Sequence, residues 1–170
     1  ADQNSPLCEE CPSGYFANTI IKNGNITFDV CQSCKRGTYG RTTAASTFTE
    51  GCGNCTSGTY SEVEGIPNAG ECKGCPRGKW SAGFGVTKES ACINCGTGKY
   101  GQDDEGANAK TSCTNCGRGT YLETVGSYGD TSCVACPLGF VQNVTGEAFC
   151  LPCTPGSYND QAGVALCLNC

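Results

Sequence analysis

The sequence predicts an array of small disulfide-rich repeats, an elongated rod or solenoid of about eight loops with short β-hairpins and little or no helix. Cysteine accounts for 18 of the 170 residues and glycine for 25. A cysteine share of about 11% is typical of folds that cross-links hold together. The apolar share of 38% falls to about 27% without the cysteines, so one continuous core is not expected.

The cysteines form nine C-x-x-C pairs that recur along the whole chain. Steps of 17 to 23 residues separate the pairs, which indicates a tandem array without an internal domain boundary. We expect a single array over residues 1–170. Its repeats lie at about 8–33, 31–54, 52–74, 72–94, 92–115, 113–135, 133–152 and 150–170.

A second motif follows the first eight pairs. A glycine lies three residues after the second cysteine, at Gly14, Gly37, Gly58, Gly78, Gly98, Gly119, Gly139 and Gly156. An aromatic residue follows two positions later, except at Val141, where the neighbouring Phe140 is expected to substitute. The glycine is expected to turn the chain at positive φ, and the ring to pack on the disulfide as a small core. Short strands are expected around this motif and just before each next pair.

Paired C-x-x-C motifs are also typical of zinc sites. The chain has no histidine, nine pairs do not divide evenly into two-pair zinc sites, and the formal net charge is −5. Glycosylation motifs indicate secretion, where cysteines oxidise. We therefore expect disulfides and no metal or other cofactor.

The motif C-x-x-C-x-x-G-x-aromatic, followed by another pair, resembles the cysteine-rich repeats of tumour necrosis factor receptors and ephrin receptors. It is also similar to the tandem C-x-x-C arrays of protist surface proteins. The resemblance runs from Cys8 to Cys170. Receptor repeats usually carry an extra cysteine within the loop, which is absent here.

The resemblance also implies a disulfide connectivity, because in those receptor repeats the second cysteine of one pair bonds the first cysteine of the next. Carried over, this gives Cys11–Cys31, Cys34–Cys52, Cys55–Cys72, Cys75–Cys92, Cys95–Cys113, Cys116–Cys133, Cys136–Cys150 and Cys153–Cys167.

Two cysteines stay unpaired in that scheme, Cys8 and Cys170. They are either halves of clipped repeats or candidates for an intersubunit disulfide. We expect the Cys167/Cys170 end of one copy to dock on the Ala1–Tyr15 end of the next, because solenoids without caps tend to stack end to end. The partner of the chain is then the chain itself, as a head-to-tail homo-oligomer.

Three N-x-[S/T] sequons occur, at Asn25, Asn54 and Asn143. We expect N-linked glycans on Asn25 and Asn143, which lie in predicted loops. Asn54 is the less favourable acceptor because Cys55 lies within its sequon.

Several other classes of function have little support. The chain has no basic run for nucleic acid and no apolar stretch for membrane insertion. Without histidine or a break in the repeat pattern, we expect no enzyme and no catalytic residues. The acidic segment 102–106 could bind calcium, but it matches no known calcium-loop spacing. We therefore favour its interpretation as a solvated loop tip. Trp80 and Phe84 are the aromatic pair most expected to be exposed.

Two functions are consistent with these features. The first is an extracellular or cell-surface structural protein, a glycosylated rod that assembles head to tail into a filament or coat. The alternative is a receptor or adhesion ectodomain that binds a protein ligand. The alternative predicts one atypical repeat, and only the loop from Cys11 to Cys31 is noticeably longer than the others.

Overall fold

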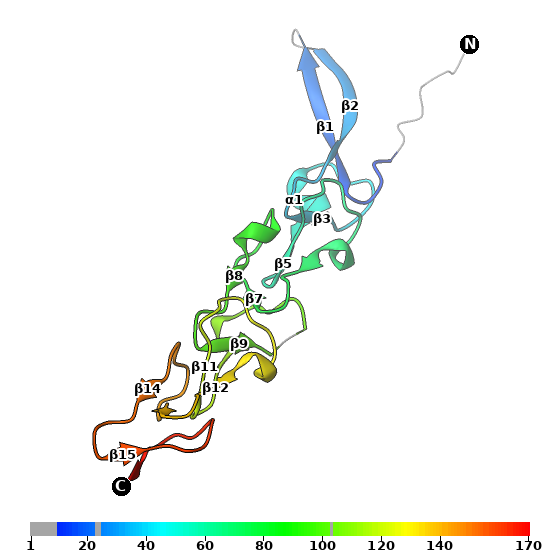
Figure 1. Ribbon diagram of the computed structural model, residues 1–170. Coiled ribbons are helices and arrows are strands. Elements are labelled where there is room, and N and C mark those ends of the chain that lie inside the picture. The colour runs from blue at the N-terminus through cyan, green and yellow to red at the C-terminus, as the bar shows by residue number, and fades with distance from the viewer. Residues whose placement is uncertain (1–9, 23–24, 103) are drawn as a thin grey trace, which may run out of the picture. The chain divides into compact units, whose positions relative to one another are not determined.

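The computed structural model describes residues 10–22, 25–102 and 104–170, without the side chains of residues 19–29. The chain forms two compact units. The first comprises Ala1–Lys73 and Gly83–Glu89, and the second comprises Gly74–Ala82 and Ser90–Cys170. Both units are built from the same kind of disulfide-closed loop (Figure 1).

Short antiparallel strand pairs make up most of the regular structure. The strands are β1 (Tyr15–Lys22), β2 (Asn25–Ser33), β3 (Thr38–Gly40), β4 (Cys52–Asn54), β5 (Thr59–Tyr60), β6 (Lys73–Gly74), β7 (Lys79–Trp80), β8 (Ile93–Asn94), β9 (Lys99–Gly101), β10 (Cys113–Asn115), β11 (Thr120–Tyr121), β12 (Val134–Ala135), β13 (Phe140–Val141), β14 (Leu151–Pro152), β15 (Ser157–Tyr158) and β16 (Leu168–Asn169). Consecutive strands pair, from β1–β2 to β15–β16. The predicted fold class, small disulfide-rich repeats with short hairpins and little helix, is confirmed.

A single helical turn precedes the second strand of several hairpins. These turns are α1 (Phe48–Gly51), η1 (Ala69–Glu71), η2 (Glu89–Ala91), η3 (Lys110–Ser112) and η4 (Asp130–Ser132). Side-chain caps stabilise α1 and η1: the Thr47 hydroxyl accepts from the Glu50 N–H, and the Asn68 side chain accepts from the Gly70 N–H. The backbone N–H and hydroxyl of Ser46 donate to the Glu50 carboxylate and lower its pKa. The expectation of strands just before each pair is wrong here, because these turns occupy those positions and the strand begins within the pair.

The first loop differs from the others. β1 and β2 form a long hairpin whose register runs from Tyr15 opposite Ser33 to Lys22 opposite Asn25 (Figure 1). A register shift interrupts the pairing between Ile20 and Ile21. The sequence predicted a longer first loop, and the structure gives that extra length to the two strands.

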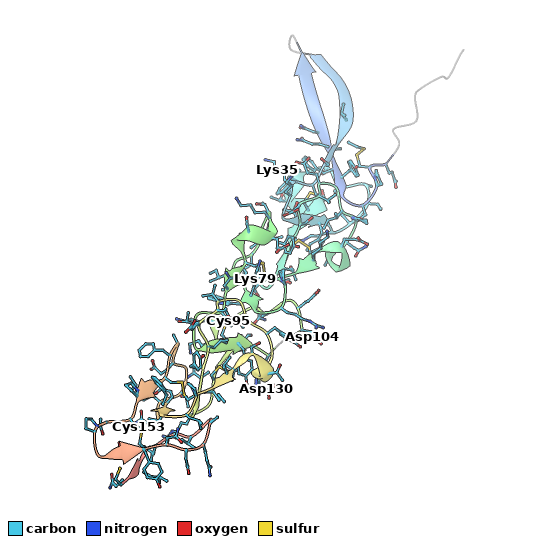
Figure 2. All side chains as sticks on the ribbon, viewed as in Figure 1. Lys35, Lys79, Cys95, Asp104, Asp130 and Cys153 are labelled. Atoms are coloured by element: carbon cyan, nitrogen blue, oxygen red, sulfur yellow. A yellow bond between two sulfur atoms is a disulfide. The ribbon has the colours of Figure 1, made fainter. Side chains whose placement is uncertain are left out.

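Eight disulfides close the loops (Figure 2). They are Cys11–Cys31, Cys34–Cys52, Cys55–Cys72, Cys75–Cys92, Cys95–Cys113, Cys116–Cys133, Cys136–Cys150 and Cys153–Cys167. These are the pairings that the resemblance to receptor repeats implies.

The cysteines, more than the aromatic rings, form the buried centre of each repeat. The second cysteines of six pairs are at most 2% exposed: Cys34, Cys55, Cys75, Cys95, Cys116 and Cys136. Of the rings at the G-x-aromatic positions, Phe16 and Tyr60 are buried, several are half-buried, and Tyr158 is exposed. The expectation of a ring core in every repeat is therefore only partly met, because the sulfur bridge fills the centre and the ring covers one side.

Candidate functional site

The glycines of the G-x-aromatic motif are contact points between loops. In the first unit, a Cβ added to Gly14 would overlap the carbonyl oxygen of Gly65, and one added to Gly37 would overlap that of Gly85. Both glycines have positive φ, as the sequence predicted. We call such a glycine, together with the loop carbonyl against it, a glycine seat. Each seat joins a repeat to the loop of the repeat two further along.

The second unit has the same arrangement. Gly78, Gly98 and Gly119 lie against the carbonyl oxygens of Gly126, Gly146 and Gly163, respectively. All three seat glycines are buried and have φ between +73° and +79°. Glycine is required there for two reasons, the positive φ and the backbone that occupies the space of a side chain.

A second set of glycines recurs in the loops, and sequence reasoning missed it as a repeat feature. All of its members except Gly106 supply a carbonyl to a seat. Its members are Gly65, Gly85, Gly106, Gly126, Gly146 and Gly163, all at positive φ. Each N–H donates to the carbonyl of the second cysteine in the preceding repeat, at 2.8 or 2.9 Å. The available signal was their position ten or eleven residues after the second cysteine of their own pair.

Ala44 takes the place of this loop glycine in the second repeat. Its N–H donates to the Cys11 carbonyl at 2.8 Å, as the loop glycines do. Its φ of 56° is positive, which among the described residues other than glycine occurs only here. We expect Ala44→Gly to raise the free energy of unfolding by about 0.5 kcal/mol, because the relief of left-handed strain exceeds the entropy cost of glycine. Urea denaturation checks this, with Ala45→Gly, at a buried position, as a control expected to lose about 1 kcal/mol.

The last two seat glycines are open. Gly139 and Gly156 have φ of +79° and +84°, as the inner ones do. Among the described residues, no atom lies within 4 Å of a Cβ added to either. Gly156 is exposed and Gly139 is half-buried, whereas the other six are buried. The final repeats therefore present a stacking surface that no loop of the described chain covers.

Exposed large apolar side chains are most numerous towards the end of the chain. In the final two repeats they are Val134, Leu138, Phe140, Val144, Phe149, Leu151, Tyr158, Leu166 and Leu168. Leu166 is 68% exposed and Leu168 is 57% exposed. We call these nine residues the apolar end surface. Elsewhere, Phe84 is 68% exposed, as expected from the sequence, whereas Trp80 is half-buried.

Charge is distributed unevenly along the chain. Residues 119–170 contain four acidic residues and no lysine or arginine, a net charge of −4. Residues 35–118 contain ten basic and eight acidic residues, a net charge of +2. The apolar end surface thus belongs to an acidic segment, and a cationic partner suits it best.

Cys170 is a free, exposed cysteine. Its backbone N–H donates to the Gly156 carbonyl at 3.0 Å. In earlier repeats, the second cysteine of a C-x-x-C pair opens the next loop, and its backbone N–H donates to a motif glycine in the same way. One example is the Cys136 N–H, which donates to the Gly119 carbonyl at 2.8 Å. Cys170 therefore has the backbone position of a cysteine that opens another loop. Cys8, its candidate partner in another copy, lies outside the described residues.

The sequons have different surroundings. Asn143 is exposed in the seventh loop. Asn54 lies in β4 beside the buried Cys55, with its side chain against Gly85. The side chain of Asn25 lies outside the described residues. Glycans on Asn143 and Asn25 stay predictions, and Asn54 stays the less favourable acceptor.

The acidic segment 102–106 has another role. The Asp104 carboxylate pairs with Arg77 at 3.0 Å and accepts the Tyr128 hydroxyl at 2.7 Å. Arg77 also stacks over the Tyr128 ring at 4.8 Å from its centroid. The described residues contain no cluster of three metal-ligating side chains, and Asp103 lies outside them. Asp104 thus links two loops of the second unit.

A known family model matches part of the chain. Residues 106–148 match the family model described as tyrosine-protein kinase ephrin type A/B receptor-like. No curated protein matches the chain. The resemblance to ephrin-receptor-like cysteine-rich repeats is thereby confirmed, and the eight serial disulfides fit it.

The fold is that of a cysteine-rich repeat module, and the match over residues 106–148 suggests an extracellular module similar to receptor or adhesion ones. Extensive disulfide bonding agrees with an oxidising compartment. None of the helices in the described ranges has the length and apolar character needed to cross a bilayer.

Proposed function

We propose that the chain is an extracellular structural module that binds further copies of itself head to tail. The observation that carries this proposal is the pair of open glycine seats at Gly139 and Gly156. Both hold the conformation of an occupied seat, so a loop of the same repeat type fits them without rearrangement. Repetition of one such contact would build a filament or a surface coat.

The second repeat of another copy offers a suitable loop for Gly156. Occupied seats join loops that are two repeats apart, so the seat at Gly156, in the eighth repeat, corresponds to the second loop of the following copy. Ala44 in that loop is exposed and has the positive φ of a loop glycine. The carbonyl of Ala44 would thus lie against Gly156. The first loop of that copy, the β1–β2 hairpin, would lie near Gly139.

Charge supports this pairing. The loop between Cys34 and Cys55 contains Lys35, Arg36 and Arg41 against a single acidic residue, Glu50. The last repeats carry only negative charge. Opposite charges on the two surfaces favour head-to-tail association over contact between two identical ends.

Apolar burial would supply most of the affinity. Covering a leucine side chain stabilises a complex by about 1.5–3 kcal/mol, and Leu166 and Leu168 are both more than half exposed. A disulfide between Cys170 and Cys8 of the next copy would close a further loop between the two copies. It would shift the count of repeats by one, so the covalent link belongs to a different register from the non-covalent docking proposed here.

Sedimentation velocity of the Cys170→Ser chain tests non-covalent association. We expect the sedimentation coefficient of this chain to rise with concentration. In the Leu166→Glu/Leu168→Glu double variant, the dissociation constant should rise by at least about 100-fold, because apolar burial is lost and charges are added.

The matched control is Val63→Glu/Phe84→Glu, with side chains 56% and 68% exposed in the first unit. It adds the same charge at similar exposure and should associate like the parent. Equal loss of association in both double variants would contradict docking through the apolar end surface.

A second candidate function is a receptor or adhesion ectodomain that binds a different protein. The atypical β1–β2 hairpin and the ephrin-receptor-like match favour it. In that case the parent chain would stay monomeric at all concentrations, and deletion of the hairpin tip would abolish ligand capture.

A further inference from the structure

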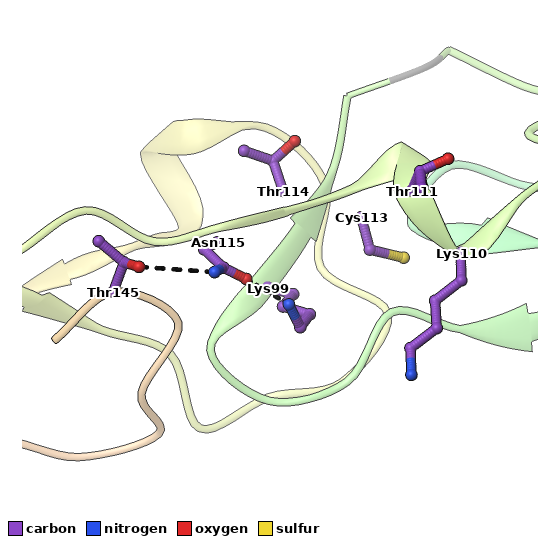
Figure 3. A pocket seen from close by; sticks show the side chains of 7 residues that line it. All are labelled: Lys99, Lys110, Thr111, Cys113, Thr114, Asn115 and Thr145. Atoms are coloured by element: carbon purple, nitrogen blue, oxygen red, sulfur yellow. Dashed lines mark hydrogen bonds between the residues drawn. The ribbon is translucent and has the colours of Figure 1, made fainter.

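A pocket of about 540 Å³ lies in the second unit. Its lining residues are Lys99, Lys110, Thr111, Cys113, Thr114, Asn115 and Thr145 (Figure 3). They come from β9, η3, β10 and the loop of the repeat two further along. This volume is within the range of small-ligand sites.

The lining carries positive charge without a carboxylate. Lys99 and Lys110 both contribute ammonium groups, and no aspartate or glutamate lines the pocket. Among the residues that the structure describes, neither ammonium forms an ion pair. Two cations that share a pocket repel each other, and a bound anion removes that repulsion.

Hydrogen bonds hold one ammonium group in place. The Lys99 ammonium donates to the Asn115 side-chain oxygen, and the Asn115 amide nitrogen donates to the Thr145 hydroxyl at 3.5 Å (Figure 3). An ammonium group has three donors, so Lys99 keeps two for a ligand. The hydroxyls of Thr111 and Thr114 add groups that can donate or accept.

Lysine occupies both of these positions only in the repeat closed by Cys95–Cys113. The positions of Lys99 and Lys110 correspond to Lys79 and Glu89 in the preceding repeat, and to Thr120 and Asp130 in the next. Opposite or single charges occupy the neighbouring repeats, so the general repeat architecture does not require two cations here.

We propose that this pocket binds a sulfated saccharide. Sulfate ester oxygens would accept from Lys99 and Lys110, and sugar hydroxyls would exchange hydrogen bonds with Thr111, Thr114 and Thr145. Sulfate esters on saccharides are anions that an extracellular module meets, and they suit compact ammonium donors. Three threonine hydroxyls and the aliphatic parts of the same side chains line this open pocket, a mixture that suits the polar and apolar faces of a sugar.

Titration calorimetry with a heparin tetrasaccharide tests the proposal, with the fully desulfated tetrasaccharide and inorganic sulfate as comparison ligands. We expect binding of the sulfated tetrasaccharide that weakens with added salt. We expect at least tenfold weaker binding of the desulfated form and of free sulfate. Equal affinity for the sulfated and desulfated forms, or for free sulfate and the tetrasaccharide, would overturn the proposal.

The variants separate the pocket from general charge. Lys99→Gln/Lys110→Gln should weaken binding of the sulfated tetrasaccharide at least tenfold. Lys73→Gln/Lys88→Gln removes the same charge from exposed positions in the first unit and should change affinity less than about twofold. Equal weakening in both double variants would contradict the pocket. Near-ultraviolet circular dichroism of each variant verifies that the fold is retained.

Discussion

Full reduction is expected to unfold the chain at room temperature. The least exposed side chains are mostly half-cystines, and many large apolar side chains are exposed. The eight bridges close sequence separations of 14 to 20 residues, and each contributes about 3 kcal/mol in the chain-entropy model. About 27% apolar residues other than cysteine cannot supply comparable burial.

Near-ultraviolet circular dichroism and limited proteolysis measure this loss. The control is alkylation without reductant, which modifies the exposed thiol of Cys170 and should leave the signal and the protease resistance unchanged. A reduced chain that kept both would show that backbone stacking alone supports the fold.

Substitution of an occupied glycine seat should have the next largest effect. Gly119 and Gly139 share a φ of +79°, but only Gly119 lies against a loop carbonyl, that of Gly163. Gly139→Ala should cost about 1 kcal/mol from backbone strain alone. Gly119→Ala should cost about 2–4 kcal/mol, because the methyl group must also displace packed backbone.

Hydrogen exchange at the Gly163 amide reports the local effect, because this N–H donates to the Cys136 carbonyl at 2.9 Å. We expect Gly119→Ala to reduce protection of this amide and Gly139→Ala to leave it nearly unchanged. Repeat arrays can unfold locally, so this readout is more direct than a global midpoint. Equal effects of the two substitutions would refute the role assigned to the seat.

The period of the C-x-x-C pairs was enough to predict the repeats and the little-helix fold. The glycine three residues after the second cysteine was also correctly assigned to positive φ, since local turn geometry depends on neighbours in sequence. These features are local, so the chain carries their signal in a single repeat.

The contacts between repeats could not be predicted in the same way. Gly98 lies against Gly146, 48 residues further along, and nothing in either local sequence indicates the other. The loop glycines were obscured by Ala44, which replaces one of them, and by the extra residue before Gly106. The sequence predicted a ring packed on the disulfide as a small core in each repeat, but six of the half-cystines are more deeply buried than any of these rings.

The candidate sites were predictable to different degrees. Sequence analysis identified Cys170 as unpaired and placed the docking surface at its end of the chain. It did not find the open seats at Gly139 and Gly156, which only the structure distinguishes from the occupied ones. It also missed the Lys99–Lys110 pocket, because the two lysines are eleven residues apart and a strand pair and a helical turn bring them together.

Electron microscopy of the purified Cys170→Ser chain tests head-to-tail association most directly. At concentrations above the association midpoint, we predict linear polymers of the parent chain and of the Val63→Glu/Phe84→Glu control. The Leu166→Glu/Leu168→Glu variant should give single chains under the same conditions. Single chains of the parent at every concentration would contradict the proposed head-to-tail association.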